Sequence, residues 1–306
     1  MGARLTERER RLRFRRRAMI PLKDDIPTAR FPVVTVALIA INVIVMIWQW
    51  GFETDPRLDE IGFGGIDQSS LEYGAIPLRI TEPTSEDCAV GAVGQPTGGQ
   101  YEPGVVCPGT PEFDEALAIA EQNPGSDLVP IPLEQAAWFI TLFTSMFMHG
   151  GILHIAGNML FLWVFGNNIE DSLGRVKFLL FYLAAGLVAV YSQAALDPES
   201  TVPTIGASGA VAGVLGAYAL LHPHARVLTL IFIVFFVTVV EIPALILLAI
   251  WFVLQFVPAI GQVATPEVGG GEGIAYLAHV GGFVFGLATI RLLVRKRDPE
   301  PRLPVY

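Results

Sequence analysis

Long stretches of uncharged, apolar sequence are the feature that most limits what this chain can fold into. Residues 32–50 carry no charged side chain, and apolar stretches resume at about residue 138 and continue nearly to the end. A helix needs about 20 apolar residues to cross the ~30 Å hydrocarbon core of a bilayer. Only 16% of the residues are charged, whereas soluble domains carry about 25%. The chain is therefore predicted to be an all-α protein that crosses a membrane several times.

Six membrane-spanning helices are expected. The stretch 227–257 has room for two short spans, or for one span after an interfacial segment. Two spans would place the basic cluster Arg295–Arg297 on the side opposite the basic N-terminus, against the positive-inside rule. We therefore interpret 227–239 as a β-branched interfacial connection. The six expected spans are 32–51, 149–169, 176–195, 206–221, about 242–258 and 274–294.

Charge is distributed unevenly on the two sides of the first span. Residues 1–31 hold ten of the 20 Lys and Arg residues, whereas 52–137 hold sixteen acidic residues and two arginines. This asymmetry predicts a cytoplasmic N-terminal tail, a long extracytoplasmic loop or module at 52–137, a core at 138–294 and a cytoplasmic tail at 295–306. The protein is thus expected to be a multi-pass protein of the cell membrane, with both termini in the cytoplasm.

An arginine-rich run from Arg8 to Arg17 opens the chain. Such a run is found in nucleic-acid-binding tails and also in tails that lie on anionic lipid head groups. A membrane span follows closely, so the lipid bilayer is the expected partner and no nucleic acid is expected.

Both cysteines, Cys88 and Cys107, lie in the acidic segment 52–137. An even pair in an exported segment rich in Pro and Gly suggests a disulfide that closes a surface loop. The alternative is two free thiols. The segment itself shows no sustained periodicity, which is compatible with a small module or with partial disorder.

Strongly polar residues inside the apolar stretches are candidates for function, because they are costly in a membrane. His149, His154 and Asn158 lie at the start of the second span, Ser208 opens the fourth, and His279 lies inside the sixth. These three spans all enter from the outside in the six-span topology. The polar residues are therefore expected at one depth, near the extracytoplasmic face.

Small residues follow both Ser208 and His279 at helical spacing. Glycines four residues apart let membrane helices pack with their backbones nearly touching. Such packing brings a short serine side chain within about 3 Å of an imidazole, the reach that a general base requires. The glycine pairs are Gly209 with Gly213 on the fourth span, and Gly282 with Gly286 on the sixth.

Taken together, the motifs of alternate spans resemble the signature of the rhomboid family of intramembrane serine proteases. A pattern at the end of the second span, Glu170-x3-Gly174-x3-Phe178, is also similar to that family. The resemblance covers about residues 138–294 and the first span. The motifs are His149-x4-His154-x3-Asn158, Gly206-x-Ser208-Gly209 and Ala278-His279-x-x-Gly282-x3-Gly286.

The resemblance implies a six-helix rhomboid-like bundle and a Ser–His dyad without an acidic third member. Ser208 is the implied nucleophile and His279 the implied general base. His154, Asn158 and the backbone N–H of Ser208 are the implied oxyanion hole, and His149 is assigned a supporting role. No cofactor is implied. The substrates would be single-span or polytopic membrane proteins, cut near the outer face.

Two further positions bear on the comparison with the family pattern. An aromatic residue that many members carry one turn after the serine is Ala212 here. Glu170 is expected to tie the inner end of the second span to the loop that follows it.

Two other classes of protein compete with this interpretation. An intramembrane zinc protease would favour His-Glu-x-x-His, whereas the histidines here are five positions apart with no acidic residue between them, so no metal site is expected. A non-catalytic rhomboid-like scaffold that binds transmembrane clients is the stronger alternative. Such scaffolds usually lack the serine or the histidine, and both are present here. The oligomeric state is left open.

Overall fold

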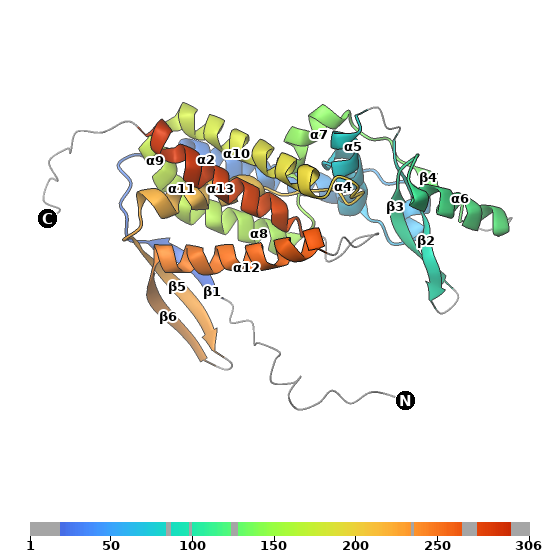
Figure 1. The fold of residues 1–306 in the computed structure, drawn as a ribbon. Helices are drawn as coiled ribbons and strands as arrows, with labels where there is room; N and C mark the ends of the chain where they lie inside the picture. Colours follow the sequence, from blue (N-terminus) through green and yellow to red (C-terminus); the bar gives the residue numbers. More distant parts are fainter. Residues whose placement is uncertain are drawn as a thin grey trace, which may run out of the picture.

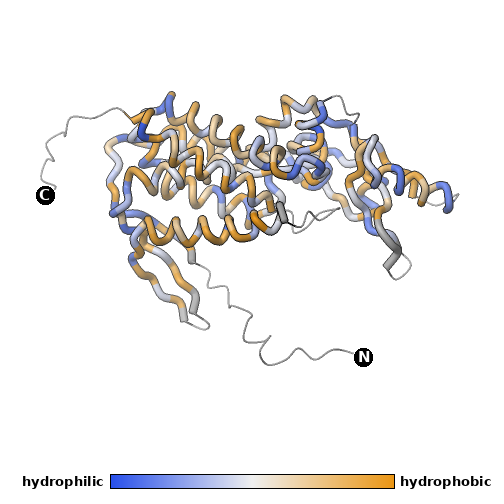
Figure 2. The backbone as a smooth tube through the Cα atoms, viewed as in Figure 1, coloured by the Kyte–Doolittle hydropathy of each residue, from blue (hydrophilic) through white to orange (hydrophobic). Residues whose placement is uncertain are grey.

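The computed structural model describes residues 19–83, 87–97, 100–123, 128–233, 236–264 and 274–294. The arginine-rich run and the tail after residue 294 lie outside these ranges, as do the predictions made for them. Within the described part, a bundle of long helices carries a smaller module at one end (Figure 1). Hydrophobic residues run along the helices of the bundle, and hydrophilic ones gather at its ends and on the module (Figure 2).

Five helices of the described part are long and apolar enough to cross a membrane. They match five of the six expected spans. The remaining one, α11 (Ser208–Leu221), has 14 residues, so it is only about 21 Å long at 1.5 Å per residue. The count of six therefore stays a prediction. The five are α2 (Val33–Trp50), the run from α8 through α9 (Ile152–Leu173), α10 (Arg175–Leu196), α12 (Ala244–Ala264) and α13 (Tyr276–Leu293).

The short helix α11 lies at the centre of the bundle. Every residue from Gly209 to Ala219 is buried, and the helix packs against both α10 and α13. By contrast, α12 exposes large apolar side chains such as Leu254 and Val257. An apolar face of this kind is unusual in water but suits contact with lipid. Burial by its neighbours thus explains how so short a helix fits in the membrane core.

The second expected span is built from three segments in one run. These are α8 (Ile152–Phe161), a π-helical turn (Leu162–Gly166) and α9 (Asn167–Leu173). The polar residues Asn167, Asn168, Glu170 and Asp171 lie within α9, beyond the expected end of the span at residue 169 or close to it. The chain reverses at Gly174, whose φ of 80° is favourable for glycine.

Glu170 has a different partner from the one predicted. Its buried carboxylate accepts hydrogen bonds from the backbone N–H groups of Val34 and Thr35 and from the Thr35 hydroxyl, at 2.8 to 3.0 Å. The first N–H groups of a helix lack partners within the helix, and Pro32, which precedes α2, offers no side-chain acceptor. Glu170 therefore ties the second span to the start of the first span, and the expected tie to the following loop was wrong.

A three-stranded antiparallel sheet is the part of the bundle that the sequence analysis did not anticipate. The stretch read as an interfacial connection forms a hairpin of β5 (Arg226–Ile233) and β6 (Phe236–Pro243), and β1 (Met19–Asp24) pairs with β5. The β-branched residues of the stretch favour this extended conformation. Among the described residues of the stretch 227–257, the hairpin is followed by one membrane helix, α12, as the topology argument required.

Strand β1 is tied to the bundle through Asp24. Its carboxylate accepts hydrogen bonds from the Asn168 amide and the Tyr218 hydroxyl. Burial raises the pKa of Asp24, and the hydrogen bond from Tyr218 opposes that shift.

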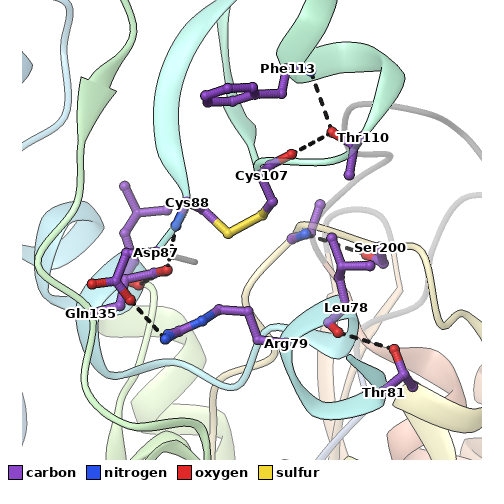
Figure 3. Close-up of a disulfide and its surroundings, with 12 residues drawn as sticks. Leu78, Arg79, Thr81, Asp87, Cys88, Cys107, Thr110, Phe113, Gln135 and Ser200 are labelled. Atoms are coloured by element: carbon purple, nitrogen blue, oxygen red, sulfur yellow. Dashed lines mark hydrogen bonds and ion pairs between the residues drawn. A yellow bond between two sulfur atoms is a disulfide. The ribbon is translucent and has the colours of Figure 1, made fainter. Parts of the chain in front are cut away.

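The segment after α2 folds into a module with its own apolar core. Cys88 and Cys107 form a disulfide in it (Figure 3). Beside the bridge, the Cys88 N–H donates to Gln135, and Arg79 pairs with Asp87. The elements are α3 (Pro56–Glu60), α4 (Gly65–Tyr73), α5 (Pro77–Thr81), β2 (Ala89–Thr97), β3 (Gln100–Val106), α6 (Pro111–Gln122) and β4 (Ile131–Pro132), followed by α7 (Trp138–Thr144).

The module contacts the bundle close to the start of α11. Ala75 and Thr204 exchange two backbone hydrogen bonds, at 2.8 and 3.2 Å. Thr204 lies four residues before Ser208, so the module is anchored to the segment that leads into α11.

Candidate active site

Ser208 and His279 meet at the end of the bundle where α11 and α13 begin. His279 Nε2 lies 2.7 Å from Ser208 Oγ. Ser208 is the first residue of α11, and His279 lies in the first turn of α13. Both side chains are half-buried. The distance is within the reach that a general base needs to take the serine proton.

The glycines named from the sequence make this approach possible. A methyl group built on Gly282 would overlap the carbonyl oxygen of Gly209, and one on Gly286 would overlap that of Gly213. The backbones of α11 and α13 are therefore in direct contact, as small residues at four-residue spacing allow. Ser208 lies one residue before this contact begins.

Gly206 makes room for a second histidine beside Ser208. Its φ of 119° is a conformation that favours glycine. A Cβ at this position would lie 2.8 Å from His154 Nε2 and 3.4 Å from Ser208 Oγ. His154 and Ser208 therefore flank the same glycine.

The ring of His154 is oriented by the turn that precedes α8. The Gly150 N–H donates a long hydrogen bond, 3.4 Å, to His154 Nδ1. When Nδ1 of a neutral imidazole accepts, Nε2 carries the hydrogen. The nitrogen that faces Gly206 is thus a donor, as an oxyanion hole requires.

Asn158 lies one turn after His154 on α8 and is buried. Its Nδ2 has no hydrogen-bond partner among the described residues. A buried amide donor without a partner costs stability, and such groups occur where a ligand supplies the missing acceptor. The two side chains implied as oxyanion donors are therefore neutral, adjacent on one helix and free to donate.

His149 supports this arrangement from behind. It is buried, and its ring lies edge-on to that of His154 with centroids 5.0 Å apart. Its backbone N–H donates to Gln49 Oε1 of α2. The hydrogen bond ties to α2 the turn that precedes α8, and this turn carries the Gly150 N–H that contacts His154.

Two residues of α12 that the sequence analysis assigned no role also contact His279. Gln255 Oε1 lies 2.7 Å from His279 Nδ1. The Trp251 ring lies one turn earlier, with its centroid 6.1 Å from that of His279. The sequence offered a signal for Gln255, since it is a polar residue near the C-terminal end of the apolar span expected at about 242–258. Trp251 and Tyr276 supply aromatic rings beside His279, and the Tyr276 centroid lies 6.4 Å from that of His279. Position 212, where many family members carry an aromatic residue, is a buried alanine.

No group of three or more His, Cys, Asp or Glu side chains is placed to hold a metal ion in the part of the chain that the structure describes. The two histidines nearest Ser208 are instead engaged with Ser208 and Gln255, or with the Gly150 turn.

Comparison with known protein families gives a match over the region that holds the candidate active site. A family model described as Rhomboid domain matches residues 136–296. This range includes α8, α11, α12 and α13, and every residue of the candidate active site described above except Gln49 of α2.

Three curated relatives show how far the similarity extends. Rhomboid protein 1, mitochondrial, of Saccharomyces cerevisiae is 35% identical over 97 residues, 30% of this chain and 28% of that protein. Rhomboid protease GluP of Bacillus subtilis is 41% identical over 85 residues, 28% of this chain and 16% of that protein. Presenilin-associated rhomboid-like protein, mitochondrial, of Homo sapiens is 27% identical over 191 residues, 58% of this chain and 42% of that protein. The chain thus matches less than half the length of each.

Proposed function

The chain belongs to the rhomboid family, and on that premise we propose that it is an intramembrane serine endopeptidase with Ser208 as nucleophile and His279 as general base. The observation that carries the proposal is the 2.7 Å contact between His279 Nε2 and Ser208 Oγ. Helices of a purely structural bundle have no need of a serine and an imidazole in hydrogen-bond contact at the start of two closely packed helices.

The proposed reaction proceeds in two halves. Ser208 Oγ attacks the carbonyl carbon of the scissile peptide bond while His279 takes the serine proton. His279 then returns that proton to the leaving amine, and an acyl ester remains on Ser208. A water molecule, deprotonated by His279, attacks the ester carbon. The ester bond then breaks, His279 returns the proton to Ser208 Oγ, and the second product leaves as a carboxylic acid.

Negative charge develops on the carbonyl oxygen in both halves. His154 Nε2–H and Asn158 Nδ2–H are proposed to donate to that oxygen, together with the Ser208 backbone N–H. Neutral donors are cheaper to bury in a membrane protein than charged ones, and a single donor of this kind is worth about 10²–10³ in rate. No described residue accepts a hydrogen bond from Asn158 Nδ2, which supports this assignment.

The substrates are proposed to be transmembrane segments of other membrane proteins. A protease acts on an extended strand, so segments with small or helix-breaking residues near the outer face fit best. The proposed orientation puts both termini in the cytoplasm and opens the site to the extracytoplasmic side, from which water enters. The exposed edge of His154 at this end of the bundle supports such an opening.

The test uses the purified full chain in detergent with a single-span substrate and a fluorophosphonate probe. Ser208→Ala and His279→Ala should each abolish cleavage and labelling while the thermal unfolding midpoint stays near that of wild type. Ser172→Ala and His224→Ala, which remove the same side chains far from the site, should retain activity. Robust cleavage by Ser208→Ala would overturn the mechanism, and an inert wild type would favour a non-catalytic scaffold.

The oxyanion hole has a separate test. Asn158→Ala should lower kcat by about 10²–10³ and leave KM nearly unchanged, because the lost bond forms mainly in the transition state. Steady-state kinetics on the same substrate measure both constants. An unchanged kcat would exclude Asn158 from the hole.

A further inference from the structure

Gln255 has an environment that is unusual for a side-chain amide. It is half-buried on α12, and the residues around it, Val253, Leu254, Phe256 and Val257, are exposed and apolar. Such a face belongs against lipid, where an amide without a hydrogen-bond partner is costly. The Gln255 side chain avoids this cost by turning inward to His279, with Oε1 2.7 Å from Nδ1.

This contact bears on which nitrogen of His279 carries the hydrogen. A neutral imidazole has one N–H and one acceptor nitrogen, and the partner of one nitrogen decides the state of the other. To take the Ser208 proton, Nε2 must be the acceptor, so Nδ1 must carry the hydrogen. An amide oxygen beside Nδ1 accepts a hydrogen bond and donates none. The position of Gln255 Oε1 therefore favours the one tautomer in which His279 can act as a base.

The contact also persists through the proposed reaction. Once His279 has taken the serine proton, both of its nitrogens are donors, and Nδ1–H still points at Gln255 Oε1. The amide oxygen stabilises the resulting cation through its dipole without placing a permanent charge in the membrane. A carboxylate would do so more strongly, but burying a carboxylate there costs more.

We propose that Gln255 is the positioning residue of His279, a neutral third member of the catalytic arrangement that holds the Nδ1–H tautomer and the ring orientation. The inference rests on the proposed function. It adds a residue from a helix that carries neither Ser208 nor His279, so the competence of the base depends on the placement of α12. Trp251, on the same face of α12 at four-residue spacing, packs near the same ring.

Three variants separate the hydrogen bond from the bulk of the side chain. Gln255→Met keeps the length and removes the acceptor, whereas Gln255→Glu keeps an acceptor at the same distance. Phe256→Met disturbs the neighbouring, lipid-exposed position of α12 and serves as the control. Each protein is measured in detergent for kcat, KM, the rate of fluorophosphonate labelling and the thermal unfolding midpoint.

Gln255→Met should lower kcat and the labelling rate roughly 10- to 100-fold, since a misoriented base forfeits part of the 10²–10⁴ that general base catalysis supplies. KM should stay within twofold. Gln255→Glu should recover at least half of the loss on a logarithmic scale, and Phe256→Met should behave as wild type. A wild-type kcat in Gln255→Met, or a Gln255→Glu protein no better than Gln255→Met, would overturn the proposal.

A spectroscopic readout tests the tautomer without relying on turnover. Nitrogen-15 NMR of histidine-labelled protein, with the His279 signals assigned by comparison with His279→Ala, should show the Nδ1–H form in wild type. Gln255→Met should show a mixture of the two tautomers. An unchanged spectrum in that variant would refute the role of Gln255 even if the protein cleaved no substrate, whereas failure of the proposed function would appear in wild type and in Ser208→Ala.

Discussion

Helix α13 contacts α11 and α12, two of the helices around it, in different ways. Against α11 the contact is backbone on backbone, because Gly282 and Gly286 face the carbonyl groups of Gly209 and Gly213. Against α12 the contact is made by side chains: Trp251 and Phe252 pack on Phe283, with ring centroids 6.0 and 4.7 Å apart. His279 lies between these two contacts, with one ring nitrogen toward each helix.

The difference assigns separate tasks to the two contacts. Backbone atoms in direct contact cannot adapt by changing rotamer. The α11–α13 contact therefore holds the helix starts that carry Ser208 and His279 at a fixed separation. Aromatic rings and a glutamine have several rotatable bonds, so the α12–α13 contact sets the orientation of the imidazole and tolerates more change. Damage to the first contact should therefore be far more severe than damage to the second.

The largest effect is expected for Gly282→Val. The added side chain would overlap the Gly209 carbonyl, so α11 and α13 must separate or the chain must fail to fold. We expect a loss of about 3 kcal/mol or more, beyond the usual cost of overpacking, and no detectable labelling of Ser208. Thermal unfolding in detergent measures the loss.

Gly157→Val is the matched control for that substitution. It places the same β-branched residue in a helix, but a Cβ at Gly157 meets no atom within 4 Å. The unfolding midpoint of this control should stay near that of wild type. Equal midpoints for the two valine variants would contradict the description of the α11–α13 contact.

A smaller effect is expected for Trp251→Leu, in the contact between α12 and α13. This change removes the ring that packs near His279 and Phe283 but leaves the glycine contact intact. We expect a loss of about 1–2 kcal/mol, below the 3–5 kcal/mol of fully buried Trp or Phe residues, and labelling of Ser208 slowed less than tenfold. Trp163→Leu, at a half-exposed tryptophan away from the site, should change neither quantity.

The smallest effect on the site is expected for the double variant Cys88→Ser with Cys107→Ser. The bridge closes a sequence separation of 19 residues, and its loss should destabilise the module by about 3 kcal/mol. The labelling rate of Ser208 should change less than twofold, because neither the α11–α13 contact nor the α12–α13 contact involves the module. A slowing comparable to that of Trp251→Leu would show that the Ala75–Thr204 contact transmits module stability to the site.

Much of the architecture was predictable because it depends on local properties of the sequence. Uncharged stretches identify the membrane helices, and the excess of Lys and Arg before the first helix argued for a single membrane helix within residues 227–257. Glycines at four-residue spacing predicted that the helices bearing Ser208 and His279 pack closely, and the structure shows their backbones in contact. The β-hairpin was missed because a β-branched, apolar stretch has the same composition whether it lies at an interface or pairs with β1.

By itself, the sequence determined that this is a membrane-embedded helical protein with Ser208 and His279 as the candidate pair, since apolar length and motif spacing are properties of single helices. Only the tertiary structure decided which side chains of other helices meet them. Glu170 binds the start of α2, and Gln255 binds the far nitrogen of His279. Both are hydrogen bonds between residues on different helices, and such partners depend on the rotation and depth at which helices pack, which no single stretch of sequence specifies.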